Sequence, residues 1–421
     1  MSIPGPETIT RHELSNGIVV LVRENHASPA VVARGYLHVG SRDERAEQAG
    51  LSAFTADALM RGTESRTFDQ IYETLESVGA SVAITGGTYT TGFGTKNLAE
   101  DLPLVLGILT DVLRHPTFPP DEVEKLRGEI LTDLDERAHD TRAMAGLAFY
   151  ELAYPQEHPY SRSVDGYSET VEDITRDDLA AFYAGGYGPR GLTVAVVGAV
   201  ETADALAQIE AAFGDWQEPT YERASLPEVS HIAEARERFV PIPGKTQSDI
   251  VLGYPGPART SPDFLEAMVC NSILGVFGLM GRLGEKVREE QGLAYYSYSR
   301  VDGGPGPGPW RVTAGVNPAN VTRAVDSIRA EIKRICQEPV DAEELADNKA
   351  FITGSLPLRL ETNEGVARTI LDMERYSLGL DYLQRYSTLI NAITAEQVQA
   401  VAQRWLDPDA YALAIAGPST E

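Results

Sequence analysis

Cysteine and basic residues are both scarce in this sequence. Only Cys270 and Cys336 occur in 421 residues, which excludes a disulfide framework and a cysteine-rich zinc site. Lys and Arg number 36 against 62 Asp and Glu, so the net charge is -26. No cluster of Lys and Arg offers a basic face, and we therefore expect neither nucleic acid nor an anionic membrane as a partner. The acidic charge either keeps the protein soluble or attracts cationic peptides.

Long apolar runs are absent as well. No window approaches about 18 uninterrupted apolar residues, so no membrane-spanning helix is expected. The first residues, MSIPGPE, lack the charged and apolar regions of a secretory signal. We therefore expect a cytoplasmic protein. A content of 43% hydrophobic and 23% charged residues is ordinary for a folded chain.

Histidine is the third scarcity, and the spacing of the histidines is informative. The seven are His12, His26, His38, His115, His139, His158 and His231. No two of them are three or four positions apart, whereas helical zinc motifs need two imidazoles on one face of a helix. An autonomous histidine-based zinc hydrolase is therefore not expected.

What the sequence does contain is an internal repeat. Apolar segments that predict buried strands occur at 31–36 and at 249–254. Each contains a Gly-Tyr pair, and the glycines, Gly35 and Gly253, are 218 positions apart (253 minus 35). This offset recurs elsewhere, which indicates a duplication.

The second half of each repeat is the clearer match. Thr175 and Thr394, 219 positions apart (394 minus 175), each stand where a helix-capping threonine is expected, followed three residues later by Asp or Gln. An apolar strand that ends in glycine follows each helix, at 192–198 and 411–417. We infer two copies of one α+β domain.

The domain boundaries follow from this repeat. We predict an N-terminal domain over 1–216, a linker over 217–236, where proline interrupts a polar stretch, and a C-terminal domain over 237–421. Helical patterns dominate 102–154 and 318–380, and strands flank them. This order predicts two homologous domains, each a mainly antiparallel sheet with helices packed on one side.

Three segments together resemble the pitrilysin or insulinase-like metallopeptidase family, close to its mitochondrial processing peptidase branch. They are GLSAFTADALMRGT at 50–63, HPYSRSVDG at 158–166 and GRLGEKVREEQGLAY at 281–295. The resemblance extends over essentially the whole chain. The family is also built from duplicated domains, which agrees with the repeat.

The zinc motif of that family is not retained. Family enzymes carry an H-x-x-E-H motif on the helix represented by 50–60, and the three positions are Ala53, Ala56 and Asp57 in this chain. The family's third ligand, a glutamate on a later helix, corresponds to Asp133. Alanine offers no lone pair, so zinc is not expected in this chain. Asp57 and Asp133 either form a weak site for a hard cation or are simply solvated carboxylates.

One functional element of the family matches. Family members place an Arg and, seven residues later, a Tyr near the scissile bond of the substrate, and Arg288 and Tyr295 have this spacing. The resemblance implies that Tyr295 donates to the developing oxyanion and that Arg288 holds a peptide carbonyl. The alternatives are a surface ion pair for Arg288 and strand packing for Tyr295.

Two glycine-rich segments carry weaker signals. The stretch GGPGPGP at 303–309 has no phosphate-binding motif, and its prolines remove amide donors. It is either a mobile surface loop or a loop that contacts substrate. The stretch ILGVFGLMG at 273–281 either permits close helix packing or corresponds loosely to the glycine-rich loop of the family's non-catalytic subunit.

The resemblance and the missing ligands together predict a non-catalytic subunit of a heterodimeric zinc metallopeptidase. A homologous partner would supply zinc, Arg288 and Tyr295 would complete its active site in trans, and a peptide would be the substrate. No cofactor is expected in this chain itself. Two alternatives remain: a peptidase-derived scaffold, like the core subunits of the respiratory complex, or a homodimer that binds peptides without cleaving them.

Overall fold

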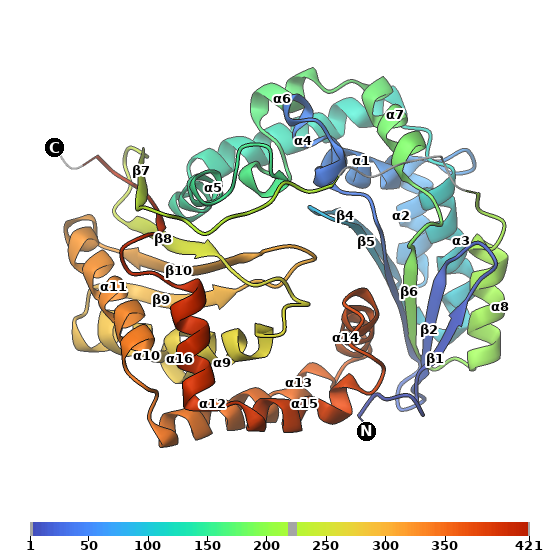
Figure 1. The fold of residues 1–421 in the computed structure, drawn as a ribbon. Coiled ribbons are helices and arrows are strands. Elements are labelled where there is room, and N and C mark those ends of the chain that lie inside the picture. The colour runs from blue at the N-terminus through green and yellow to red at the C-terminus, as the bar shows by residue number, and fades with distance from the viewer. Residues whose placement is uncertain (1–2, 218–224, 420–421) are drawn as a thin grey trace. The chain divides into compact units, whose positions relative to one another are not determined.

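Two β-sheets organise the chain, which the computed structural model describes over residues 3–217 and 225–419 (Figure 1). The chain divides into two units with one sheet each, and neither unit is continuous in sequence. Unit 1 comprises Met1–Leu134, Ser163–Ser225 and Pro357–Gln384, and unit 2 comprises Asp135–Arg162, Leu226–Leu356 and Arg385–Glu421. Part of the predicted linker, 218–224, lies outside the described residues.

Unit 1 is built on a six-stranded sheet in the order β1-β2-β6-β3-β5-β4. Its strands are β1 (Thr10–Glu13), β2 (Val19–Glu24), β3 (Ala30–Leu37), β4 (Ser81–Gly86), β5 (Thr91–Leu98) and β6 (Thr193–Gly198). Its helices are α1 (Leu51–Ala58), α2 (Phe68–Ser77), α3 (Leu102–Arg114), most of α4 (Pro120–Ala138), α6 (Ser168–Asp173), α7 (Arg176–Gly186), α8 (Thr202–Phe213) and α14 (Asn363–Arg375). Short 3-10 helices are η1 (Ser41–Asp43), η2 (Ala46–Gln48), η3 (Leu59–Arg61) and η4 (Ala99–Asp101).

Unit 2 is built on a five-stranded sheet in the order β7-β11-β8-β10-β9. Its strands are β7 (Arg236–Pro241), β8 (Ser248–Pro255), β9 (Ala294–Val301), β10 (Pro309–Val316) and β11 (Ala412–Gly417). Its helices are α5 (Thr141–Ala153), α9 (Phe264–Gly275), α10 (Phe277–Leu283), the π-helix η6 (Gly284–Glu290), α11 (Val321–Gln337), α12 (Ala342–Gly354), α16 (Ala395–Trp405) and the 3-10 helices η5 (Pro159–Ser161) and η7 (Pro318–Asn320). Two further helices, α13 (Leu356–Arg359) and α15 (Tyr382–Ala392), cross the boundary between the units.

The two sheets repeat one topology, which confirms the predicted duplication. The series β2-β6-β3-β5-β4 of unit 1 corresponds to β7-β11-β8-β10-β9 of unit 2. In each series the first pair is parallel and the remaining pairs are antiparallel. Both predicted capping boxes are present, since the hydroxyls of Thr175 and Thr394 accept from the backbone N–H groups of Asp178 and Gln397.

Alternation along β3 explains why helices cover one face of the first sheet. Val31, Ala33 and Leu37 point into the hydrophobic core beneath α1, α3 and α8, and Arg34 and Tyr36 belong to the opposite face. Helices α1, α3 and α8 of the N-terminal half thus lie on one side of this sheet, as predicted. On the opposite face a helix from the C-terminal half, α14, packs against β3 and β6 (Figure 1).

Unit 2 receives a helix from the N-terminal half in the same way. Helix α5 packs against β7, β8 and β11 through Ala145, Ala148 and the fully buried Phe149. The predicted boundaries at 217–236 describe the duplication, whereas the compact units exchange the segments around α5 and α14.

The cysteines and the most apolar helices can now be placed in the fold. Cys270 in α9 and Cys336 in α11 are both buried free thiols. No single helix of the described residues is long and apolar enough to cross a membrane. Only the consecutive segments Phe264–Gly275 and Phe277–Glu290, bent by 88°, pass the same test of length and composition when taken together.

Candidate functional site

Helix α1 carries the positions of the missing zinc motif. Gly50 precedes the helix with φ of 99°, a left-handed conformation that favours glycine. The carboxylate of buried Glu44 caps the helix, since it accepts hydrogen bonds from the N–H groups of Gly50 and Ser52 at 3.2 and 2.8 Å. Ala56 is fully buried and Ala53 half-buried. Neither has a donor atom, so the helix does not fit a zinc ion.

Asp57 is the one ligand-type residue at these three positions, and its surroundings are acidic. Asp57 is exposed at the surface, yet the surrounding protein desolvates its carboxyl group and raises the pKa to about 6, and the negative charges of Asp165 and Asp133 add to that effect while Arg61 opposes it. Asp133 is therefore close enough to Asp57 to affect its pKa. The resemblance implies that these two positions are neighbours. Among the described residues, however, their carboxylates and a third such group do not all lie within 4.8 Å of one another. The predicted hard-cation site gains no support from this spacing.

The raised pKa of Asp57 predicts a pH-dependent effect on stability. A carboxyl group with a higher pKa in the folded state favours folding at low pH, and this stabilisation is lost as the pH rises from about 4 to about 6. We expect Asp57→Asn to raise the melting temperature at pH 8 by a few degrees, on the order of 1 kcal/mol or less because solvent screens the site. At pH 4 the variant and wild type should melt alike.

Thermal unfolding at the two pH values checks this expectation. The matched control is Asp326→Asn, which removes an exposed carboxylate from α11. An equal shift in both variants, or a shift of Asp57→Asn that does not depend on pH, would contradict the assignment.

Arg288 and Tyr295 lie at the two ends of a tight turn in unit 2. Arg288 belongs to η6, and the turn is closed by hydrogen bonds from Gly292 N–H to the Arg288 carbonyl and from Leu293 N–H to the Val287 carbonyl, both 3.0 Å. Gly292 has φ of 61°. The guanidinium of Arg288 is 3.5 Å from the carboxylate of the adjacent Glu289. The predicted surface ion pair is thus present, but such a pair contributes only about 0–1 kcal/mol.

Tyr295 is the extra residue of a β-bulge on an edge strand. The ladder between β9 and β10 pairs Ala294 with Val316 and Tyr296 with Gly315, so Tyr295 has no partner. Its side chain is 77% exposed, the largest exposure among the large hydrophobic residues of the described chain. Strand packing, the alternative interpretation of Tyr295, is therefore wrong.

The residue after the bulge anchors it to helix α5. The hydroxyl of Tyr296 donates to the buried carboxylate of Asp249, and Arg142 Nε donates to the same hydroxyl at 3.0 Å. The Arg142 guanidinium lies 4.2 Å from the centre of the Tyr296 ring, and the Thr141 hydroxyl donates to Asp249 at 2.5 Å. Burial and the bond to Asp249 raise the pKa of Tyr296. The exchanged helix thereby fixes the strand beside Tyr295.

Two family models match this chain. The model described as "Insulinase (Peptidase family M16)" matches residues 19–162, and the model described as "Peptidase M16 inactive domain" matches residues 173–351. The chain belongs to the M16 peptidase family. The resemblance inferred from the three segments is confirmed at the level of the family.

The relatives of this M16 protein are full-length matches at low identity. It is 28% identical over 409 residues to an uncharacterized zinc protease of Streptomyces coelicolor, covering 95% of this chain and 87% of that one. An uncharacterized zinc protease of Bacillus subtilis is 24% identical over 425 residues, covering 98% of both.

Solved structures show the same fold. A peptidase M16 inactive domain from Pseudomonas fluorescens superposes with a TM-score of 0.89 at 23% identity, covering 98% of both chains. A protease from Helicobacter pylori gives a TM-score of 0.89 at 19% identity, covering 99% of this chain and 100% of that one.

Sequence reasoning missed the anchoring network of this M16 chain. Asp249 begins the segment DIVLGY, and the remaining five residues of that segment are all apolar or glycine. A single carboxylate in such a strand indicates a buried polar partner, and this signal could have revealed the network. Arg34, within the strand AVVARGYL, is the equivalent signal in unit 1. The partners of Asp249, Thr141 of α5 and Tyr296 of β9, come from segments far away in sequence, and Arg34 faces α14 of the C-terminal half.

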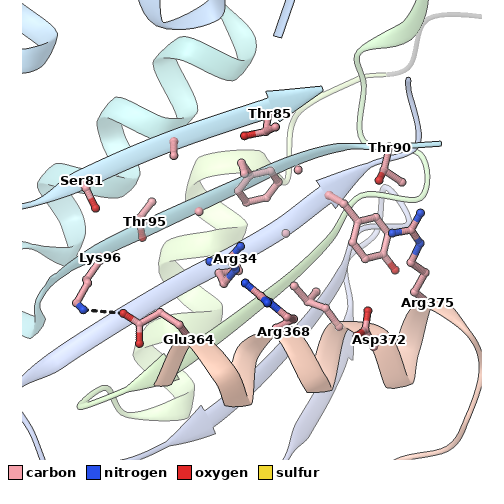
Figure 2. Close-up of a pocket in the computed structure, with 17 residues that line it drawn as sticks. Arg34, Ser81, Thr85, Thr90, Thr95, Lys96, Glu364, Arg368, Asp372 and Arg375 are labelled. Carbon is pink, nitrogen blue, oxygen red and sulfur yellow. Dashed lines mark ion pairs between the residues drawn. The ribbon is translucent and has the colours of Figure 1, made fainter. Parts of the chain in front are cut away.

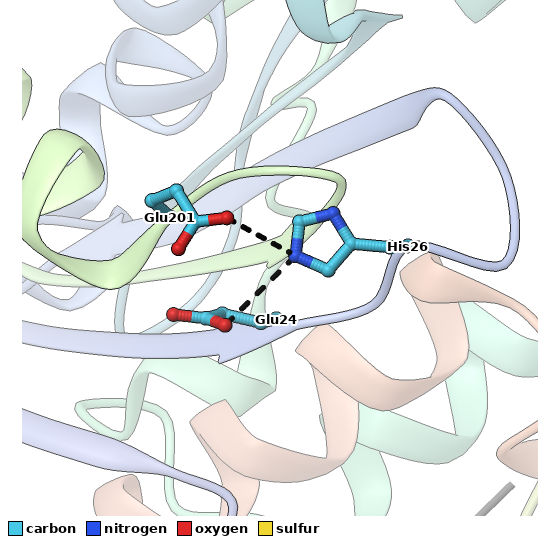
Figure 3. A group of neighbouring side chains, drawn as sticks. All are labelled: Glu24, His26 and Glu201. Carbon is cyan, nitrogen blue, oxygen red and sulfur yellow. Dashed lines mark ion pairs between the residues drawn. The ribbon is translucent and has the colours of Figure 1, made fainter.

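The three side chains of Glu24, His26 and Glu201 form the one group in residues 3–217 and 225–419 whose spacing could suit a metal (Figure 3). All three are exposed, and His26 Nε2 lies 3.8 and 3.7 Å from the two carboxylates. Glu24 already accepts from the N–H and hydroxyl of Thr202 at 2.8 and 2.6 Å, which lowers its pKa. Capping of α8 explains this arrangement, and we assign no metal to it.

Both glycine-rich segments have structural roles. In the loop 303–309, the Pro307 carbonyl accepts from the Tyr154 hydroxyl at 3.2 Å and the Gly304 carbonyl from Arg259 N–H at 3.0 Å, which anchors the loop. In 273–281, a Cβ on Gly275 would lie 2.2 Å from the backbone nitrogen of Ser299, so glycine is required for close packing on β9. Close packing therefore explains Gly275, whereas Gly278 and Gly281 have φ of 60° and 61° in a non-helical part of the stretch.

Proposed function

We propose that this chain is the non-catalytic subunit of a heterodimeric M16 zinc metallopeptidase. In this proposal a homologous partner supplies the zinc motif, and this chain supplies Arg288 and Tyr295 to the partner's active site. The substrate is an unfolded peptide, and the complex acts in the cytoplasm. The proposal requires no zinc in this chain, in keeping with the alanines at positions 53 and 56.

The observation that carries the proposal is the state of Tyr295. A tyrosine that is 77% exposed on a β-bulge has no packing role, and no described residue bonds its hydroxyl. Bulges on edge strands commonly direct a side chain toward a site. A phenol held in this way can donate to the oxyanion of a tetrahedral intermediate, and Arg288 can hold a neighbouring peptide carbonyl.

The relatives support the same division of labour. Two of them are described as zinc proteases, whereas a solved structure of the same fold is described as an M16 inactive domain. Proteins of this fold are thus described both as zinc proteases and as inactive domains. We take this to be compatible with a heterodimer in which one subunit holds zinc and the other completes the active site.

Reconstitution tests the proposal. We expect this chain to purify without stoichiometric zinc and without peptidase activity, and to gain activity when co-expressed with an M16 homologue that has an intact H-x-x-E-H motif. The measurements are zinc content by mass spectrometry, the mass of the complex, and cleavage of an unstructured quenched-fluorescence peptide. The control replaces the glutamate of the partner's motif by glutamine.

Two outcomes would contradict the proposal. A zinc-dependent activity of this chain alone would show that it is self-sufficient. An assembled pair that holds zinc but cleaves nothing, while this chain still binds peptide, would favour the alternative of a peptide-binding protein without a proteolytic role.

A further inference from the structure

A cavity of about 410 Å³ lies in unit 1 between the sheet and helix α14 (Figure 2). Strands β3, β4 and β5 form one wall, and α14 forms the other. The volume is within the range of small-ligand pockets, about 300–1,000 Å³. The charged residues that line it are Arg34, Lys96, Glu364, Arg368, Asp372 and Arg375. Four basic residues against two acidic ones is the reverse of the ratio in the chain as a whole.

The charges of this cavity do not all neutralise one another. Lys96 pairs with Glu364 at 2.7 Å. By contrast, the side chains of Arg34, Arg368 and Arg375 have no hydrogen bond to an acceptor and no ion pair within the described part of the chain. The cavity thus brings together three guanidinium groups that have no carboxylate within 4.0 Å among the described residues.

The two central arginines approach from opposite walls. Figure 2 shows Arg34 of β3 and Arg368 of α14 pointing toward each other. Arg34 lies across Gly94 of β5, and its Cζ and Nη1 atoms are 3.7 Å from the position that a Cβ would take there, an ordinary van der Waals distance. Burial lowers the pKa of Arg34, and the charge of Arg368 lowers it further, whereas the charge of Glu364 raises it in part. The two guanidinium groups therefore repel each other, and a bound anion would reduce this repulsion.

Arg375 adds a third donor at one end of the cavity. Its guanidinium carbon lies 5.4 Å from the centre of the Tyr36 ring, and its Nε is buried without a hydrogen-bond partner. A buried donor without an acceptor is destabilising, and a bound acceptor would remove this cost.

We propose that this cavity binds a carboxylate group of a peptide, with Arg34 and Arg368 as its ligands. The planar fork of a guanidinium matches the two oxygens of a carboxylate, and one bound carboxylate would also relieve the repulsion between the two arginines. The inference rests on the proposed function, since it takes the ligand to be a peptide. It makes acidic peptides, rather than the cationic ones suggested by the charge of -26, the preferred substrates. The carboxylate belongs to an acidic side chain or to the C-terminus.

Fluorescence anisotropy with three peptides of equal length tests the inference on the full chain. The first has glutamates and an amidated C-terminus, the second has glutamines and a free C-terminus, and the third has glutamines and an amidated C-terminus. We expect the first or the second to bind at least tenfold more tightly than the third, and the difference between the first two identifies the source of the carboxylate. Inorganic phosphate should compete with the peptide that binds.

Variants locate the site. Arg34→Gln and Arg368→Gln should each weaken binding of the carboxylate peptide about tenfold. Arg368 is exposed on α14, so its variant remains informative if Arg34→Gln folds poorly. The control is Arg323→Gln, which removes an exposed arginine from α11 in unit 2.

The outcomes separate this inference from the proposed function. Equal binding of all three peptides, or equal effects of all three variants, would overturn the carboxylate site and leave the peptidase proposal standing. If phosphate binds but none of the peptides does, the cavity is an anion site and the proposal that its ligand is a peptide carboxylate is wrong. A reconstituted pair that cleaves nothing would overturn the proposed function, whereas the peptide affinities would still decide the carboxylate site.

Discussion

Tyr295→Phe is expected to lower the turnover of the reconstituted peptidase by about 10²–10³-fold. Loss of one hydrogen-bond donor to an oxyanion has an effect of this size in enzymes that stabilise tetrahedral intermediates. The substitution removes a single oxygen atom from a side chain that is 77% exposed, so the fold loses no contact. Because the hydroxyl acts only in the transition state, kcat should fall while KM changes little.

A matched variant on the same strand isolates this effect. Tyr298→Phe removes a hydroxyl from a half-buried tyrosine of β9 and should leave the rate within about twofold. Arg288→Ala should act differently from Tyr295→Phe, raising KM as well as lowering kcat, because the guanidinium holds the peptide. Arg288→Lys should restore charge without the planar fork and therefore recover only part of the affinity.

These kinetics can refute the role in trans. If Tyr295→Phe and Tyr298→Phe reduce the rate equally, the hydroxyl of Tyr295 has no special place in the reaction. If Tyr295→Phe also lowers the melting temperature of the isolated chain, its effect on the rate is structural.

The repeat and the strands were predictable because their signals are local. Alternation and capping depend on residues within one turn or one strand, so β3, β8 and the starts of α7 and α16 agree with the sequence. The sheet class followed as well, since consecutive helical patterns between strands do not suit regular parallel units.

The exchange of helices was not predictable from the same signals. Helix α5 is mostly apolar, which indicates that it is buried, but hydrophobic burial is not directional and does not specify which sheet receives the helix. The bond from Thr141 to Asp249 joins residues of different sequence halves, as does the pair Lys96–Glu364. A single sequence without such contacts therefore indicates the duplication but not the composition of the two units.

Some features of the candidate site were likewise predictable from the sequence, and others depend on the tertiary structure. Ala53 and Ala56 exclude zinc on chemical grounds alone, and the spacing of Arg288 and Tyr295 is visible in the sequence. The bulge that exposes Tyr295 depends on the register between β9 and β10, and the cavity of Arg34 and Arg368 depends on the placement of α14. Both are tertiary features. The sequence therefore left the role of the acidic charge open, and the proposal that acidic peptides bind rests on the cavity alone.

Phe149→Ala tests the exchanged helix and is expected to destabilise unit 2 by about 3–5 kcal/mol. Phe149 is fully buried on α5 and packs in the core that α5 forms with the face of the second sheet. Truncation loses the burial of the ring and leaves a cavity, and the cost of this change in protein cores is about 3–5 kcal/mol. Since domains are stable by only about 5–15 kcal/mol, this is a large fraction of the total.

Location matters as much as magnitude in this experiment. Hydrogen exchange should accelerate in α5, β8 and β11, which are separate in sequence but belong to unit 2, whereas β3 and β5 of unit 1 should stay protected. The control is Phe351→Ala on α12 of the same unit, which makes the same change at a side chain that is 41% exposed and should cost about 1 kcal/mol or less. If α5 and β3 of the N-terminal half instead lose protection from hydrogen exchange together, α5 unfolds cooperatively with the N-terminal half and not with unit 2. In that case the anchoring of Tyr296 by Arg142 cannot be what holds the bulge of Tyr295 in place.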